Sequence, residues 1–173
     1  MRLAWLAPFA MGIVTMAATA VTAALAAPAP QVSIASLKQL ATPLPSPYDP
    51  AADAQSQLAA AKAQARAQHK LLLIDLGGNW CADCRLLAGV MALPEVKGFV
   101  DAHYVVTAID VGRMDRNLQI PAGYGVRRIA GVPSILVIDG AGRLVDAGHI
   151  DALADARSMT PQALADWLAR WTP

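Results

Sequence analysis

The chain has 173 residues, a length that suits one domain with additional segments. Its 14 Lys and Arg residues are nearly balanced by 13 Asp and Glu residues and form no basic run, which argues against nucleic acid as a partner. Apolar residues make up 55% of the chain, but much of this fraction is alanine, so the core is poorer in large side chains than the percentage suggests.

The N-terminus has the pattern of a secretory signal peptide. After Arg2 no charged residue occurs before Lys38, and the apolar run ends at residues 24–26, an A-x-A cleavage site. An uncleaved membrane anchor is the less favoured alternative, because the run approaches the roughly 20 residues that span a bilayer. The sequence thus predicts a signal peptide at residues 1–26 and a periplasmic or secreted protein, in a compartment where disulfides persist.

Residues 27–50 are predicted to be a proline-rich linker. The segment 28–50 holds half of the 12 prolines and includes TPLPSPYDP, a composition that favours extended polyproline-II structure. Asp49-Pro50 then has the pattern of a helix start, with Asp49 as the N-cap and Pro50 in the first turn. A folded domain is therefore expected over residues 51–173.

The expected domain alternates helices and strands. Its leading segment is rich in helix-favouring alanine and glutamine, and short apolar or β-branched runs predict strands. Strands are expected at 71–76, 103–110, 133–139 and 143–150, the last two joined by a turn at 139–142, with helices after Pro50, from the cysteine pair to Met91 and from Pro161, and an irregular connection at 111–123. This order predicts an α/β fold in which helices flank both faces of a mixed central sheet.

The two cysteines of the chain, Cys81 and Cys84, lie in the stretch GGNWCADCRLLAG. Three residues apart at a predicted helix start, they share one face and are within disulfide reach. The N–H groups and the dipole at a helix N-terminus favour thiolate over thiol, so the first cysteine can attack and the second can resolve. The pattern favours a redox-active pair.

Two other interpretations of the pair stay open at this point. A structural disulfide would close a loop of four residues, worth only roughly 2 kcal/mol of chain entropy. A metal site would need more ligands, because zinc usually takes three or four from the protein, and His69, His103 and His149 have no ligand spacing. We expect no metal, and no cofactor besides the redox-active disulfide itself.

Three features around the pair match a known family. Residues 80–84, Trp-Cys-Ala-Asp-Cys, follow an apolar strand in the form W-C-x-x-C, and YGVRRIAGVPSILVID is similar to a segment in which a cis-proline precedes a central strand. A hairpin and an amphipathic helix follow. Over about residues 55–172 the sequence resembles the thioredoxin superfamily, in its exported thioredoxin-like branch. The resemblance implies the thioredoxin fold and puts the cis-proline at Pro133.

The resemblance also implies roles for individual residues. Cys81 would attack a substrate disulfide, and Cys84 would resolve the mixed disulfide. Pro133 would face the pair and expose the backbone of Val132 to an extended substrate segment, while Trp80 would shield the pair and offer a flat apolar contact. The simpler interpretations are a strand-start proline and a packing tryptophan.

Asp75 is placed where many thioredoxins have a buried carboxylate. Burial raises the pKa of a carboxylate, so Asp75 could exchange a proton with Cys84 as general base or acid. The alternative is a strand-end aspartate bonded to the next loop. The lysine that accompanies this carboxylate in those thioredoxins has no counterpart here, since residues 104–112 contain no Lys or Arg.

Ala82 and Asp83 depart from the Gly-Pro of thioredoxin itself and are expected to tune the redox pair. At roughly 6 Å and an effective dielectric constant of about 20–80, the Asp83 charge would repel a thiolate by on the order of 0.7–3 kcal/mol. A destabilised thiolate predicts a more reducing couple, and hence a reductase or isomerase rather than an oxidase. Asp83 could also act simply as a favourable acid in the first turn of the helix.

The sequence therefore predicts an exported thiol–disulfide oxidoreductase that acts on other proteins through Cys81 and Cys84. Its expected partners are exported proteins with disulfides and, as the family implies, a membrane-spanning disulfide reductant as electron donor; the protein itself is expected to be a monomer. The alternatives are a redox-idle peptide-binding module of the same fold and a copper chaperone. The connection 111–123 could border the active site or be an inert insertion.

Overall fold

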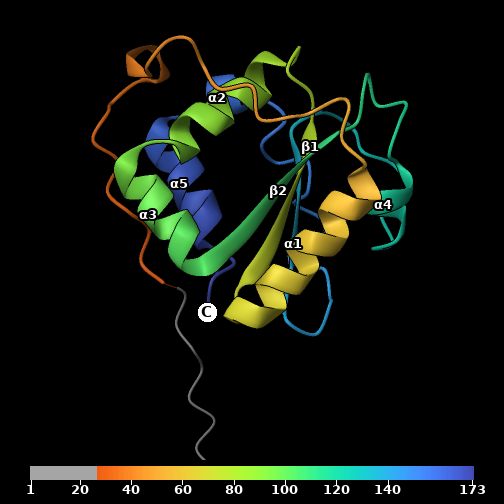
Figure 1. The fold of residues 1–173 in the computed structure, drawn as a ribbon. Helices are drawn as coiled ribbons and strands as arrows, with labels where there is room; N and C mark the ends of the chain where they lie inside the picture. The colour runs from red at the N-terminus through yellow and green to blue at the C-terminus, as the bar shows by residue number, and fades with distance from the viewer. Residues whose placement is uncertain (1–26) are drawn as a thin grey trace, which may run out of the picture.

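A mixed β-sheet lies at the centre of the computed structural model, which describes residues 27–173 (Figure 1). Its strands are β1 (Leu71–Gly77), β2 (Tyr104–Asp110) and β3 (Ser134–Ile138), in the order β2-β1-β3. β1 pairs with β2 in parallel and with β3 in antiparallel register. The helices are η1 (Leu37–Gln39), α1 (Ala54–Gln68), α2 (Ala82–Met91), α3 (Pro94–His103), α4 (Gln119–Ala122), η2 (Ala156–Ser158) and α5 (Pro161–Ala169). The prediction of an α/β fold with a mixed central sheet is confirmed.

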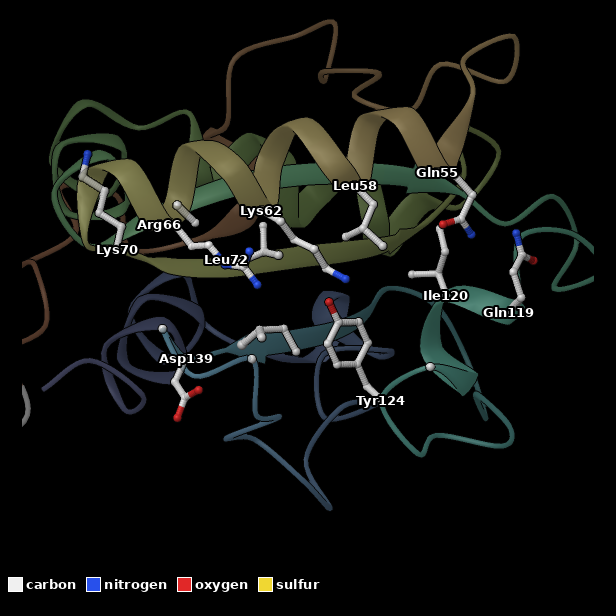
Figure 2. A pocket seen from close by; sticks show the side chains of 15 residues that line it. Gln55, Leu58, Lys62, Arg66, Lys70, Leu72, Gln119, Ile120, Tyr124 and Asp139 are labelled. Atoms are coloured by element: carbon white, nitrogen blue, oxygen red, sulfur yellow. The ribbon is translucent and has the colours of Figure 1, made fainter.

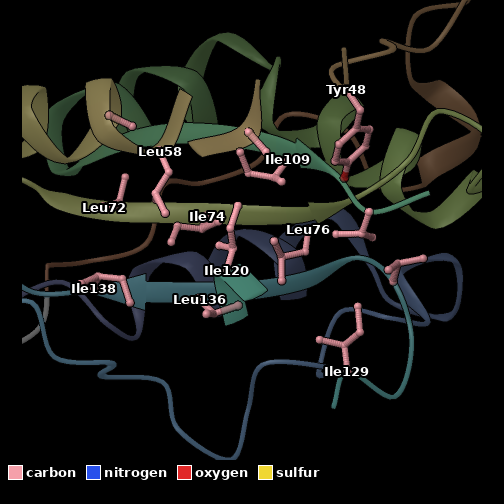
Figure 3. Packing of buried hydrophobic residues seen from close by; sticks show 14 of the residues in the cluster. Tyr48, Leu58, Leu72, Ile74, Leu76, Ile109, Ile120, Ile129, Leu136 and Ile138 are labelled. Atoms are coloured by element: carbon pink, nitrogen blue, oxygen red, sulfur yellow. The ribbon is translucent and has the colours of Figure 1, made fainter. Parts of the chain in front are cut away.

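The central strand β1 is buried on both faces, which explains its unbroken apolar sequence. Leu72, Ile74 and Leu76 face the cluster that contains Leu58 of α1 and Ile120 of α4 (Figure 3). Leu73 lies in the cluster formed with α2, α3 and α5 on the opposite side of the sheet (Figure 1). Since strand side chains alternate, Asp75 is directed to the same face as Leu73.

The segment 27–50, expected to be an extended linker, lies against the domain instead of standing apart from it. It has little regular structure, as expected, but Leu40 and Tyr48 are only 7% and 2% exposed. Leu40 packs in the α2/α3/α5 cluster, and the guanidinium of Arg85 donates to the carbonyl oxygens of Leu44 (2.7 Å) and Pro45 (3.1 Å). The segment is therefore part of the folded unit.

The signal peptide predicted at residues 1–26 lies outside the described residues. From residue 27 to the C-terminus, none of the helices combines the length and the apolar character needed to cross a membrane.

One helix begins later than predicted, and one helix was not predicted. α1 begins at Ala54, because the side chain of Asp53 accepts the Ser56 N–H at 2.7 Å, whereas Asp49 forms a turn by accepting the Ala51 N–H. α2 ends at Met91, as predicted. However, a further helix, α3, begins at Pro94 and was not predicted; proline is tolerated there because a first-turn proline loses no helical hydrogen bond.

The strand predicted at 143–150 is not regular. Leu144 makes one isolated bridge to Ile138, and the next ladder position is taken by a side chain: the Asp146 carboxylate accepts the Val137 N–H at 2.9 Å. At the Val137 N–H, a buried carboxylate thus takes the place of a backbone carbonyl. The connection predicted at 111–123 contains the short helix α4 but is otherwise irregular.

Candidate active site

The cysteine pair lies at the N-terminus of α2, directly after the loop that leaves β1. Cys81 is the N-cap of α2 and Cys84 lies one turn along it; the two form a disulfide with their Cα atoms 5.3 Å apart. The backbone N–H of Cys84 points at Cys81 Sγ over 3.2 Å. In the reduced protein this N–H and the helix dipole would stabilise a thiolate on Cys81. Cys81 is slightly exposed (5%) and Cys84 is fully buried.

Pro133 lies opposite the pair. The Val132–Pro133 peptide bond is cis, and the carbonyl oxygen of Val132 is 3.3 Å from Cys81 Sγ. The structure therefore brings Val132, Pro133 and Cys81 together across a sequence separation of about 50 residues.

Trp80 forms the exposed rim of the site. Its side chain is 45% exposed, and its indole N–H donates to the Gly112 carbonyl oxygen at 2.7 Å. The guanidinium carbon of Arg113 lies 4.2 Å from the centroid of the Trp80 ring, a cation–π contact. Because Gly112 and Arg113 belong to the connection 111–123, this connection borders the site at Trp80, next to Cys81. The sequence alone favoured neither this position nor an inert insertion.

Asp75 is a buried carboxylate near the end of β1. It is 3% exposed, and its Oδ1 atom accepts a 2.8 Å hydrogen bond from the Tyr48 hydroxyl. Burial raises the pKa of Asp75 to about 7, and the hydrogen bond from Tyr48 partly opposes this rise. A carboxyl group with this pKa can both take and give a proton near neutral pH.

Tyr48 was not among the site residues predicted from the sequence. It lies in the segment predicted as a linker, 27 positions before Asp75, and no spacing or motif connects the two. The one available signal was that Tyr48 is the single aromatic residue in the proline-rich stretch 28–50.

Asp83 forms an ion pair with Arg157, a partner that the sequence did not predict. The Arg157 side chain donates through Nε to both carboxylate oxygens (2.9 and 3.0 Å) and through Nη2 to Oδ2, and its backbone N–H adds a bond of 2.8 Å. Burial alone would raise the pKa of Asp83, but the bonds and charge of Arg157 outweigh it and lower the pKa. The guanidinium therefore offsets much of the repulsion that we expected Asp83 to exert on a thiolate. Ala82, between the two cysteines, is exposed.

The cavity in Figure 2 does not coincide with this site. It has a volume of about 390 Å³, lies between α1, α4 and the end of β3, and is bordered by Lys62, Arg66 and Tyr124. Neither the cysteines nor the residues around them line it. Within residues 27–173, no three His, Cys, Asp or Glu side chains gather as a metal site.

Comparison with known proteins shows what the chain is similar to. Residues 53–140 match a family described as thioredoxin-like. A solved structure of a disulphide isomerase from Xylella fastidiosa Temecula1 is 35% identical, with a TM-score of 0.68, over 73% of this chain and 97% of the other. A mutant thioredoxin from Halobacterium salinarum NRC-1 is 23% identical, with a TM-score of 0.45, over 75% and 96% of the two chains. No curated protein matches the chain.

Proposed function

The chain belongs to the thioredoxin-like family, and we propose that it is an exported thiol–disulfide oxidoreductase of the reductase or isomerase type. The observation that carries the proposal is the Cys81–Cys84 pair itself. It lies at a helix N-terminus, with the Cys84 N–H directed at Cys81 Sγ and the Val132–Pro133 peptide on its open side. The disulphide isomerase from Xylella fastidiosa, at 35% identity, supports reduction or isomerisation rather than oxidation.

The proposed reaction begins with the reduced protein. The Cys81 thiolate attacks one sulfur of a substrate disulfide, a Cys81–substrate bond forms, and the substrate bond breaks, so that the leaving sulfur takes a proton. The substrate strand would lie along Val132, and Trp80 would cover its apolar side. Both residues border Cys81: the Val132 carbonyl oxygen lies 3.3 Å from Cys81 Sγ, and Trp80 directly precedes Cys81 in the chain.

The second step releases the substrate. Asp75 takes the proton of Cys84, whose thiolate attacks Cys81 Sγ; the Cys81–Cys84 bond forms, and the second substrate sulfur leaves and is protonated. The substrate gains two electrons and the protein loses two, so an external reductant must restore the dithiol. We assign this role to a membrane-spanning disulfide reductant, because the predicted signal peptide directs the protein away from cytosolic reductants.

The test is reduction of insulin by the pre-reduced protein, compared with a Cys81→Ala/Cys84→Ala double variant. The wild-type protein should reduce insulin stoichiometrically, and catalytically when its dithiol is regenerated. The double variant should show only the background rate, because the chain has no other cysteine. If the double variant kept the activity of the wild-type protein in the cell, the peptide-binding alternative would replace this proposal.

A further inference from the structure

The active-site loop fixes the position of Tyr48. Asn79, two residues before Cys81, accepts the Tyr48 N–H through its side-chain oxygen (3.1 Å) and donates its amide to the Tyr48 carbonyl (2.7 Å). This two-point contact pairs the backbone of Tyr48 with a residue of the loop that presents the cysteines. A rigid backbone lets a long side chain keep a defined direction.

The residue that follows the cysteine pair also binds the segment that carries Tyr48. Arg85 directly follows Cys84 and donates to the carbonyl oxygens of Leu44 and Pro45, four and three residues before Tyr48. Residues on both sides of the redox pair therefore bind the segment that carries Tyr48. Its placement is coupled to that of the pair.

The hydroxyl of Tyr48 ends beside both Asp75 and Cys84. It donates to Asp75 Oδ1 at 2.8 Å, and Figure 3 shows the ring directed towards the carboxyl end of β1. A methyl group added at Gly77 would collide with the Tyr48 hydroxyl and would come within 2.8 Å of Cys84 Sγ. The hydroxyl and the sulfur thus approach the same side of Gly77, which explains why this position has no side chain.

The Tyr48 hydroxyl is the one side-chain hydrogen-bond donor to Asp75 among residues 27–173. The other titratable groups nearby are the cysteines of α2 and Asp110 of β2, and a cavity of about 290 Å³ that Asp75 lines also reaches Lys97 and Asp101 of α3. Burial, the charge and hydrogen bond of Asp75, and the charge of Asp110 all raise the pKa of Tyr48. The hydroxyl therefore stays protonated and acts as a fixed donor.

We propose that Tyr48 is a positioning residue of the redox centre, whose hydroxyl orients the Asp75 carboxyl group and favours its charged form, so that Asp75 can take the proton of Cys84. The inference rests on the proposed function and adds to it a residue from the N-terminal segment. A hydrogen bond to a charged acceptor is stronger than one to a neutral acceptor, so the donor stabilises the carboxylate over the acid. The Tyr48 hydroxyl would thus stabilise the Asp75 carboxylate, as a lysine on the neighbouring strand would if the chain had one there.

The test compares Tyr48→Phe with the wild-type protein, and uses Tyr124→Phe as a matched control. Both variants lose one tyrosine hydroxyl, but that of Tyr124 is buried without a hydrogen-bond partner and lies at the remote cavity of Figure 2. The pKa of the Asp75 carboxyl group is followed by NMR titration of the oxidised protein, in which the cysteines do not titrate. Tyr48→Phe should raise this pKa by about one pH unit, and Tyr124→Phe should leave it unchanged.

The same shift should appear in the reaction. The acid limb of the pH profile for disulfide exchange by Tyr48→Phe should move to higher pH by about one unit, roughly a tenfold loss of rate on that limb. A merely structural role would lower stability without moving this limb. An Asn79→Ala variant keeps the hydroxyl but loosens its anchor, and it should shift the Asp75 pKa in the same direction by a smaller amount.

An unchanged Asp75 pKa in both Tyr48→Phe and Asn79→Ala would overturn the inference. The carboxyl titration requires no activity, so it separates this failure from that of the proposed function. A wild-type protein that reduces no disulfide would refute the proposed function, whatever the Asp75 pKa shows.

Discussion

A Cys84→Ser variant is expected to accumulate as mixed disulfides in which Cys81 is joined to a substrate cysteine. Cys81 caps α2, is the more exposed of the two cysteines, and its sulfur faces the Cys84 N–H that would stabilise its thiolate. Without the buried thiol of Cys84, the attack that releases the substrate cannot occur, and turnover should fall by at least about a thousandfold. Non-reducing electrophoresis followed by mass spectrometry of the trapped species measures the outcome.

The matched control is Cys81→Ser, which keeps the buried Cys84 and should trap little or nothing. Equal trapping by the two variants would contradict the assignment of Cys81 as nucleophile and Cys84 as resolving cysteine. The proteins captured by Cys84→Ser would also identify the substrates.

An Asp75→Asn variant is expected to gain stability above neutral pH and to lose activity. The pKa of Asp75 is raised from its usual value of 3.8 to about 7 by burial, so the folded state binds a proton more tightly than the unfolded state does. The contribution of this group is most favourable below the unfolded pKa and is lost as the pH rises to about 7. The buried charge then costs at most about 4 kcal/mol, and the amide avoids that cost.

The measurement is urea unfolding of the oxidised proteins at about pH 5 and about pH 8. Asp75→Asn should exceed the wild-type protein by about 2–3 kcal/mol more at the higher pH. The cost of the unpaired amide N–H₂ is the same at both pH values and therefore cancels in this comparison. Its disulfide exchange should be slower and should lose the acid limb of the pH profile, because the proton acceptor for Cys84 is gone. A stability difference that does not depend on pH would contradict the raised pKa.

The strands and the redox helix could be predicted because their signals are local. β1, β2 and β3 are short apolar or β-branched runs, and the cysteine spacing and the downstream proline mark the site without any tertiary information. α3 was missed because a proline that ends one helix also begins the next. The prediction of a regular strand at 143–150 was wrong, because the Asp146 carboxylate takes the place of a backbone carbonyl in the hydrogen bond with the Val137 N–H. A local sequence pattern does not show which group a side chain will bind.

The features that tune the site could not be read from the sequence, because they are contacts between distant residues. Asp83 and Arg157 are 74 residues apart, and this pairing weakens the repulsion from which a reducing couple was predicted. Tyr48 and Asp75 are separated by 27 residues, in segments assigned to a linker and to the domain. A charge or a hydroxyl gains its effect from its partner, and only the fold identifies that partner.

The reduction potential of the Cys81–Cys84 disulfide tests the central claim most directly. It can be measured by equilibrating the protein with thiol–disulfide buffers of known potential and following the fraction of oxidised protein. We expect a single two-electron transition between about −270 mV and about −180 mV, the range from thioredoxin to protein disulfide isomerase. A pair that stays oxidised below about −300 mV would be a structural disulfide, and a potential near about −120 mV would indicate an oxidase. Either result would contradict the account.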